Sequence, residues 1–169
     1  MIRNNGIDLS IPFPGSDFGQ GFYLTNNRGQ VEEWARAKAE DANERNSGFT
    51  AKPVVLRYEI NLGKMQQLDG KVFSESNLEW SKFILENRYQ AKPYYDLGYD
   101  YAIGPVADGR MRSLMQLYRM KKLTDIEFMN EIRPFGQVET YTQLSVHSLK
   151  AVNSLILKEV EYIEEVSRF

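Results

Sequence analysis

The sequence of 169 residues predicts an α+β fold. Segments with helical and with strand-like patterns follow one another, but without the regular strand–helix–strand repeat that predicts a parallel sheet. Hydrophobic residues make up 42% and charged residues 26% of the chain, as in ordinary globular domains. This length suits a single hydrophobic core. We therefore expect one domain over residues 1–169.

The first regular elements that the sequence predicts are a short strand and a long helix. Phe22 to Thr25 is aromatic and β-branched enough for a short strand. A helix is predicted from Asn27 to about Asn46, because Asn27 is a good N-cap and Gln30 stands at the third helical position. Trp34 is expected on the buried face of that helix.

The middle of the chain predicts two strands and a second helix. Pro53 to Asn61 alternates in the manner of a strand, and a short strand is expected around Gln66 to Leu68. Ser76 and Glu79 have the spacing of a capping box, which predicts a helix running to about Asn87. Trp80 belongs to the predicted buried stripe of this helix.

The last part of the chain again mixes strands and helices. Tyr99 to Ala107 is apolar and predicts a central strand, ended by a turn at Asp108 and Gly109. Thr124 and Glu127 form another capping box. The remaining predictions are helices over 111–121 and 124–132, a strand over 137–147, a helix over 148–155 and a strand over 156–166.

Composition excludes several classes of site. The chain has no cysteine, so it has no disulfide, thiolate metal site or cysteine nucleophile, and its one histidine, His147, cannot form a histidine cluster. We expect no metal. No segment approaches the length of an apolar membrane span, and the first residues lack a signal-peptide core. No membrane partner is expected, and the predicted location is the cytoplasm, or a target cell after delivery.

Two local features have both a structural and a functional interpretation. Gly19-Gln20-Gly21 allows a tight turn or the close approach of a ligand, and Tyr23 follows it as a ligand contact or an ordinary core tyrosine. A basic cluster either contacts nucleic acid or balances acidic residues elsewhere, and we favour the second interpretation. It consists of Arg110, Arg112, Arg119, Lys121 and Lys122.

Three sequence blocks carry a resemblance to a known family. They are Asp17-Phe18-Gly19-x-Gly21-Phe22-Tyr23-Leu24-Thr25, the stretch from Tyr99 to Asp108, and Gln143-Leu144-Ser145-Val146-His147-Ser148. This pattern resembles a bacterial family of domains of unknown function (number 3990), which is grouped with the ADP-ribosyltransferase toxins. The resemblance implies a split, mostly antiparallel sheet with flanking helices, and NAD as the substrate.

The resemblance also implies roles for individual residues. ADP-ribosyl transfer breaks the bond between nicotinamide and ribose through an oxocarbenium-like transition state. Tyr23 would stack on nicotinamide and Gln143 would face the ribose. Glu139, in a Gln137-x-Glu139 spacing found in several ADP-ribosyltransferases, is an alternative acidic group. Further cofactor contacts are expected from Gly19, Gly21, Phe22, Thr25, Arg88, Asp108 and His147. For three of them a structural role is the alternative: Asp108 as a turn or cap residue, Arg88 as a helix C-terminal cation, and His147 as a structural histidine.

Two departures from the family pattern keep several functions open. The usual first strand, with its Tyr-His-Gly-Ser-like motif, is missing before Asp17, and Gln143 replaces a glutamate. The first hypothesis is an NAD-dependent ADP-ribosyltransferase, a toxin of a toxin–antitoxin or phage-defence system, with a protein or nucleic-acid acceptor and an antitoxin partner. The second is a catalytically degenerate module that binds a nucleotide or a partner. The third is an interaction module whose loop is purely architectural.

Overall fold

The computed structural model describes residues 6–11, 15–45, 48, 50–90, 93–134 and 142–164. The chain divides into two compact units. The sheet unit contains residues 1–26 and 62–154, and the ribbon unit contains residues 27–61 and 155–169. Helices and strands are mixed in both, so the α+β prediction is confirmed, whereas a single domain stays a prediction.

The described strands of the sheet unit form a four-stranded sheet of order β1-β5-β4-β3. Strand β5 is antiparallel to both of its neighbours, and β4 and β3 are parallel. The predicted strand before residue 26 and the predicted central strand are therefore confirmed, as is a mostly antiparallel sheet. The strands are β1 (Phe22–Thr25), β3 (Gly70–Val72), β4 (Tyr101–Pro105) and β5 (Thr142–Val146).

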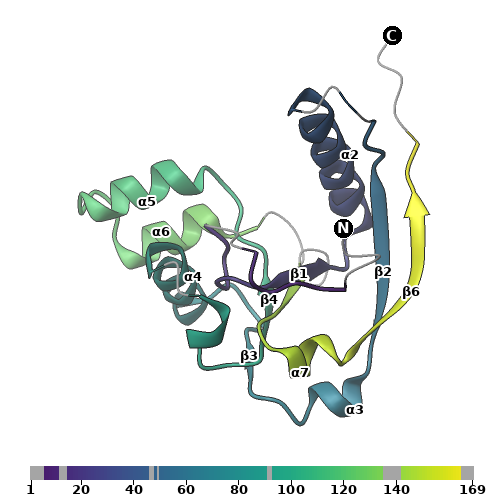
Figure 1. The fold of residues 1–169 in the computed structure, drawn as a ribbon. Helices are drawn as coiled ribbons and strands as arrows, with labels where there is room; N and C mark the ends of the chain where they lie inside the picture. Colours follow the sequence, from purple (N-terminus) through teal and green to yellow (C-terminus); the bar gives the residue numbers. More distant parts are fainter. Residues whose placement is uncertain are drawn as a thin grey trace. The chain divides into compact units, whose positions relative to one another are not determined.

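Helices flank this sheet, and α4, α5 and α6 gather beside it (Figure 1). The helices of the unit are α3 (Leu62–Met65), α4 (Leu78–Gln90), a 3₁₀ turn (Tyr94–Asp96), α5 (Met111–Arg119), α6 (Asp125–Ile132) and α7 (Leu149–Val152). Apolar residues of α4, α5 and α6 share one core cluster with the sheet and its adjoining segments. The cluster consists of Phe18, Phe73, Trp80, Ile84, Leu85, Ala102, Met111, Phe128 and Ile132. None of the described helices is both long and apolar enough to cross a membrane.

Two predicted helix caps have different outcomes. Thr124 and Glu127 form the predicted capping box of α6. At α4, however, the side-chain oxygen of Asn77 accepts a bond from the backbone N–H of Trp80 at 3.0 Å, so the prediction of Ser76 as the cap is wrong. Ser and Asn cap helices about equally well, and two adjacent candidates cannot be ranked by type alone. The displaced Ser76 hydroxyl is buried and has no hydrogen-bond partner among the described residues.

The segment after residue 61 also differs from its prediction. A strand around Gln66 to Leu68 is wrong, because these residues form the turn between α3 and β3. The backbone N–H groups of Gln66, Gln67 and Leu68 bond to carbonyls of the preceding helical turn. The backbone N–H groups of these residues therefore bond within a local turn, and not to a neighbouring strand as predicted.

The described residues of the ribbon unit form one helix and two strands. Strands β2 (Val54–Ile60) and β6 (Leu155–Tyr162) pair antiparallel with a bulge after Arg57. Helix α2 (Arg28–Arg45) contacts β2, and the predicted Asn27 cap is confirmed by its bond to the N–H of Gln30 at 3.1 Å.

The prediction that Trp34 is buried is wrong, because its side chain is 57% exposed. Only Ala39 is buried among the described residues of α2, and most of the helix sequence is charged or polar. An amphipathic pattern identifies the inner face of a helix only when several apolar residues share that face. The predicted face combined Trp34 only with the smaller Val31, Ala35 and Ala42, which does not meet that condition.

Candidate functional site

Residues predicted to contact NAD come together on one face of the sheet. In the β1–β5 pair, Tyr23 lies opposite Ser145 and Thr25 lies opposite Gln143. Directly opposed residues of an antiparallel pair point to the same face, and so do residues two apart on one strand. Tyr23, Thr25, Gln143 and Ser145 therefore share one face. That face is turned toward the core, since Tyr23 packs against the core cluster.

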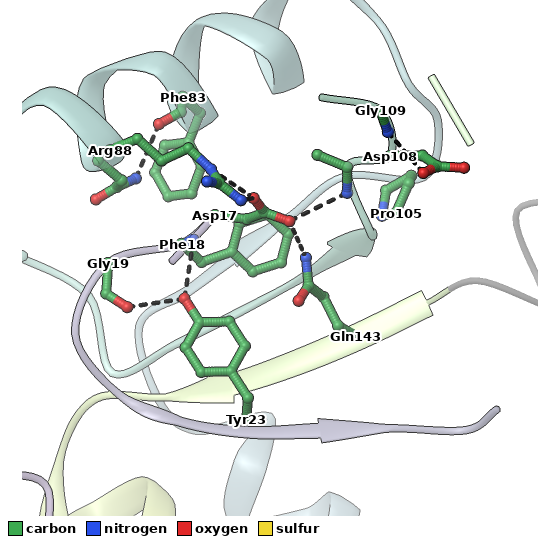
Figure 2. Close-up of polar contacts among 12 residues, drawn as sticks. Asp17, Phe18, Gly19, Tyr23, Phe83, Arg88, Pro105, Asp108, Gly109 and Gln143 are labelled. Atoms are coloured by element: carbon green, nitrogen blue, oxygen red, sulfur yellow. Dashed lines mark hydrogen bonds and ion pairs between the residues drawn. The ribbon is translucent and has the colours of Figure 1, made fainter. Parts of the chain in front are cut away.

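Asp17 is the centre of the polar contacts beside this face (Figure 2). Its carboxylate is 6% exposed. One carboxylate oxygen accepts from Nε and Nη2 of Arg88, at 2.9 and 2.6 Å. The other oxygen accepts from the backbone N–H of Ala107 at 3.1 Å and from the side-chain amide of Gln143 at 2.9 Å. A loop, a helix, the end of β4 and strand β5 are thus joined through one side chain.

The four donors explain why a charge is tolerated at this depth. Removing a carboxylate from water is costly unless the charge is paired and its lone pairs are satisfied. Charge-assisted bonds from a guanidinium are among the strongest available in a protein. The arrangement also engages the groups of Arg88 and Gln143 that were expected to face NAD. In this conformation Arg88 holds a carboxylate of the chain instead of a phosphate.

The Tyr23 side chain connects strand β1 to the loop that contains Gly19 and Gly21. Its hydroxyl accepts from the N–H of Phe18 at 2.9 Å and donates to the carbonyl of Gly19 at 2.7 Å (Figure 2). Burial raises the pKa of this phenol above its ordinary value, so the hydroxyl keeps its proton at neutral pH. Gly19 has φ of +87°, a conformation that residues with a side chain rarely adopt. Tyr23 and Gly19 together define the turn.

His147 is buried in a short hydrogen-bonded chain. Its Nδ1 lies 2.9 Å from the carbonyl oxygen of Gln20, and its Nε2 contacts the hydroxyl of Ser145. Because a carbonyl only accepts, Nδ1 carries the proton and Nε2 accepts from Ser145. Burial lowers the pKa of His147 to about 4, and the Tyr99 and His147 rings pack nearly perpendicular with centroids 5.0 Å apart. The histidine is therefore neutral at pH 7, and both of its ring nitrogens contact groups of the chain.

The comparison with protein families agrees with the sequence blocks that meet at this face. Residues 3–157 match the model of a protein family of unknown function, DUF3990. The chain belongs to this family. No curated protein and no solved structure matches the chain.

Other predicted site residues of this DUF3990 chain make contacts of their own. Thr25 donates through Oγ1 to the carbonyl of Thr142 at 3.3 Å, and Phe22 lies on the opposite face of β1 from Tyr23. Asp108 is exposed, and its carboxylate accepts from the adjacent N–H of Gly109 at 2.6 Å, as a turn residue does (Figure 2). Glu139 lies outside the described residues. Within the described ranges, no group of acidic or histidine side chains is arranged to hold a metal.

Two residues at this face had no role predicted from the sequence. Asp17 accepts the hydrogen bond of Gln143, and Ser145 of strand β5 contacts His147 through its hydroxyl. A signal for Asp17 was present in the sequence, because an acid directly before Phe18 in an apolar, glycine-rich motif needs a partner if it is buried. No comparable signal marks Ser145.

Gly21 has a packing role that can be tested by adding one methyl group. A Cβ atom there would lie 2.6 Å from Nδ1 of His147 and 2.7 Å from the carbonyl oxygen of Val146. We expect Gly21→Ala to lower the free energy of unfolding by about 1–3 kcal/mol through overpacking. Urea denaturation measures this. Gly29→Ala is the control, since Gly29 is in helix α2 and an added Cβ would make only an ordinary contact with Oδ1 of Asn27 at 3.5 Å. Alanine there should stabilise by about 0.5–1 kcal/mol. Equal effects of the two changes would contradict the assigned contact.

The neutral His147 predicts a pH-dependent stability. The unfolded chain protonates this histidine near its ordinary pKa of 6.5, whereas the folded chain does so only near 4. Between these values the unfolded state binds more protons, so stability falls as the pH is lowered. We expect the histidine to account for a loss of about 2 kcal/mol between pH 7 and pH 5. Urea denaturation at a series of pH values measures it.

The control for this pH dependence is His147→Asn, whose amide can donate to the carbonyl of Gln20 but does not titrate. Both proteins keep the same carboxylates, so their contribution cancels in the comparison. In the variant, the free energy of unfolding should fall less steeply as the pH is lowered, because the contribution of the histidine is absent. Identical slopes in the two proteins would show that His147 does not carry it.

Proposed function

We propose that this DUF3990 chain is a catalytically inactive, ADP-ribosyltransferase-like module that binds NAD or a related nucleotide. The observation that carries the proposal is the bond between the Gln143 amide and Asp17. Transfer needs negative charge against an oxocarbenium-like ribose, and an amide supplies none. The charge of Asp17 is itself engaged by Arg88, Ala107 and Gln143.

The same contact supports binding. A carboxylate only accepts hydrogen bonds, so the nitrogen of the Gln143 amide faces Asp17 and its oxygen faces away. The chemistry of that oxygen suits a ribose hydroxyl, although Gln143 is buried in this conformation. Tyr23 supplies an aromatic ring on the same sheet face. The pairing of an aromatic ring with a ribose-binding group on neighbouring strands is what the ADP-ribosyltransferase resemblance leads us to expect.

The competing function is NAD-dependent transfer to a macromolecule by a bacterial toxin. The feature that favours it is Glu139, an acid in the sequence just before β5. A glutamate near the ribose would supply the charge that Gln143 lacks. Under this alternative a protein or nucleic acid is the acceptor, and an antitoxin protein would neutralise the toxin.

Thermal unfolding with and without NAD, combined with labelled NAD in a bacterial lysate, separates these functions. We expect NAD to raise the unfolding midpoint and no label to enter protein or nucleic acid. At NAD concentrations about 100 times the Kd, the stabilisation would be about 2.7 kcal/mol. Tyr23→Leu should remove the NAD-dependent rise, measured against that variant's own midpoint. Tyr95→Leu is the matched control, because Tyr95 is 78% exposed and should keep the rise.

Two outcomes would contradict the proposal. Label that enters a macromolecule, and disappears in Glu139→Ala, would establish transfer, and digestion with protease or nuclease would then identify the acceptor. The absence of any NAD-dependent rise in the wild-type protein would exclude nucleotide binding at Tyr23 and leave an architectural role for the loop.

A further inference from the structure

A hollow of about 590 Å³ opens at the ends of α4 and α5, and its lining includes neither Asp17 nor the residues that bond to Asp17. The hollow is widely open to solvent, and its volume falls within the range of sites for small ligands. Three of its residues, Arg119, Lys121 and Leu123, lie at the end of α5 and in the turn to α6. The lining is Tyr89, Tyr118, Arg119, Lys121, Leu123 and Asp125.

The charges of this hollow are unbalanced. Asp125 is paired with Lys82 at 3.1 Å and accepts from the Tyr118 hydroxyl at 2.7 Å. Within the described part of the chain, neither Arg119 nor Lys121 lies within 4 Å of a carboxylate. The sequence between Asp108 and Asp125 has no acidic residue, although it has five basic ones. The hollow therefore attracts an anion.

The aromatic walls are held in fixed positions. The Tyr89 hydroxyl donates to the carbonyl of Met115 at 3.0 Å, and the Tyr118 ring packs on Phe128 with centroids 5.3 Å apart. The guanidinium of Arg119 lies over the Tyr89 ring, 4.6 Å from its centroid. A guanidinium positioned by an aromatic ring is a flat cation on which a planar group can stack.

Lys121 occupies a backbone position that normally belongs to glycine. Its φ is +56°, and Lys121 and Lys122 donate their N–H groups to the carbonyls of Tyr118 and Leu117, as at the end of many helices. A residue with a long side chain is disfavoured in this conformation. A lysine that breaks the local rule while lining a hollow without a counter-charge points to a role for its ammonium group.

We propose that this hollow binds a nucleoside phosphate. The phosphate would lie against Arg119 and Lys121, and the base would stack beside the Arg119–Tyr89 pair. Asp125 offers an acceptor for a hydroxyl or amino group of the ligand. The ligand is either a free nucleotide or one nucleotide of a single-stranded nucleic acid, since both present a phosphate next to a planar base. The site shares no residue with the proposed NAD site, so either proposal can fail alone.

Binding to the full chain is measured by NMR titration with AMP, adenosine, inorganic phosphate and a single-stranded oligoadenylate. AMP should bind at least about tenfold more tightly than adenosine or phosphate alone, because it uses both halves of the hollow. Arg119→Gln and Lys121→Asn should each weaken AMP binding by about tenfold, the usual effect of losing one charge-assisted bond. Asparagine is chosen because it tolerates the left-handed backbone. Arg112→Gln removes an equal charge from α5 outside the hollow and should change binding by less than about twofold.

The arms of this experiment distinguish the two sources and test the site. Oligoadenylate that binds more tightly than AMP, and is weakened by Lys121→Asn but not by Arg112→Gln, identifies nucleic acid as the source. Equal affinity per nucleotide identifies the free nucleotide. The proposal is overturned if wild type shows no saturable binding of AMP or oligoadenylate at millimolar concentration, if phosphate alone binds as tightly as AMP, or if Arg112→Gln weakens binding as much as Lys121→Asn. Lys121→Asn should keep the NAD-dependent thermal rise, and its loss there would place NAD in this hollow.

Discussion

Asp17→Ala should lower the free energy of unfolding by about 3–5 kcal/mol, the range found when one partner of a buried ion pair is removed. The substitution leaves the Arg88 guanidinium, whose side chain is 20% exposed, without its carboxylate. It also leaves the Gln143 amide and the Ala107 N–H without their acceptor. Each unsatisfied donor adds a desolvation cost of its own. Urea denaturation followed by circular dichroism measures the change.

The control for Asp17 is an ion pair in the same unit that water already solvates. Glu79 pairs with Lys71 at 2.9 Å, but the two side chains are 67% and 42% exposed. Glu79→Gln should cost less than about 1 kcal/mol. A double variant of Asp17→Asn with Arg88→Met, which removes both charges, should be less destabilised than Asp17→Ala. If Asp17→Ala costs no more than Glu79→Gln, the buried network does not hold the loop to the sheet.

Most elements of the fold were predicted because their signals are local. The strand at Phe22 to Thr25, the Asn27 cap and the capping box at Thr124 all rest on side chains within a few residues of one another. The predictions failed where the local sequence does not distinguish between two arrangements, such as two possible cap residues or two possible inner faces of a helix. Asn77 rather than Ser76 caps α4, and Trp34 lies on the outer face of a helix whose sequence is almost uniformly polar.

The candidate site was predicted less completely because its contacts are not local. The sequence placed Tyr23 and Gln143 in separate motifs, and the β1–β5 register brings them to one face. It did not predict that Asp17 would hold both Gln143 and Arg88, which lie 126 and 71 positions away along the chain. Gly21 was interpreted as a point of ligand approach, yet the space beside it is filled by His147. Partners at such separations follow only from the tertiary fold.

Trp80→Ala should also lower the free energy of unfolding by about 3–5 kcal/mol, the range of a large-to-small change in a core. The Trp80 side chain is fully buried in the core cluster, and its indole N–H donates to the carbonyl of Pro105 at 3.0 Å. The chain offers a matched control, since Trp34→Ala removes the same side chain from an exposed position. That control should cost less than about 0.5 kcal/mol. Equal costs would show that burial does not distinguish the two tryptophans.

Trp80→Phe separates the packing of Trp80 from its hydrogen bond. Phenylalanine keeps much of the ring, but it leaves the Pro105 carbonyl without a donor, which should cost about 1–3 kcal/mol. Pro105 ends β4, and two residues later the N–H of Ala107 reaches Asp17. If Trp80 fixes this strand end, its substitution also disturbs the Asp17 contacts. Trp80→Phe and Asp17→Ala combined should then cost less than the sum of their separate effects, whereas additive costs would show that the core and the polar network act independently.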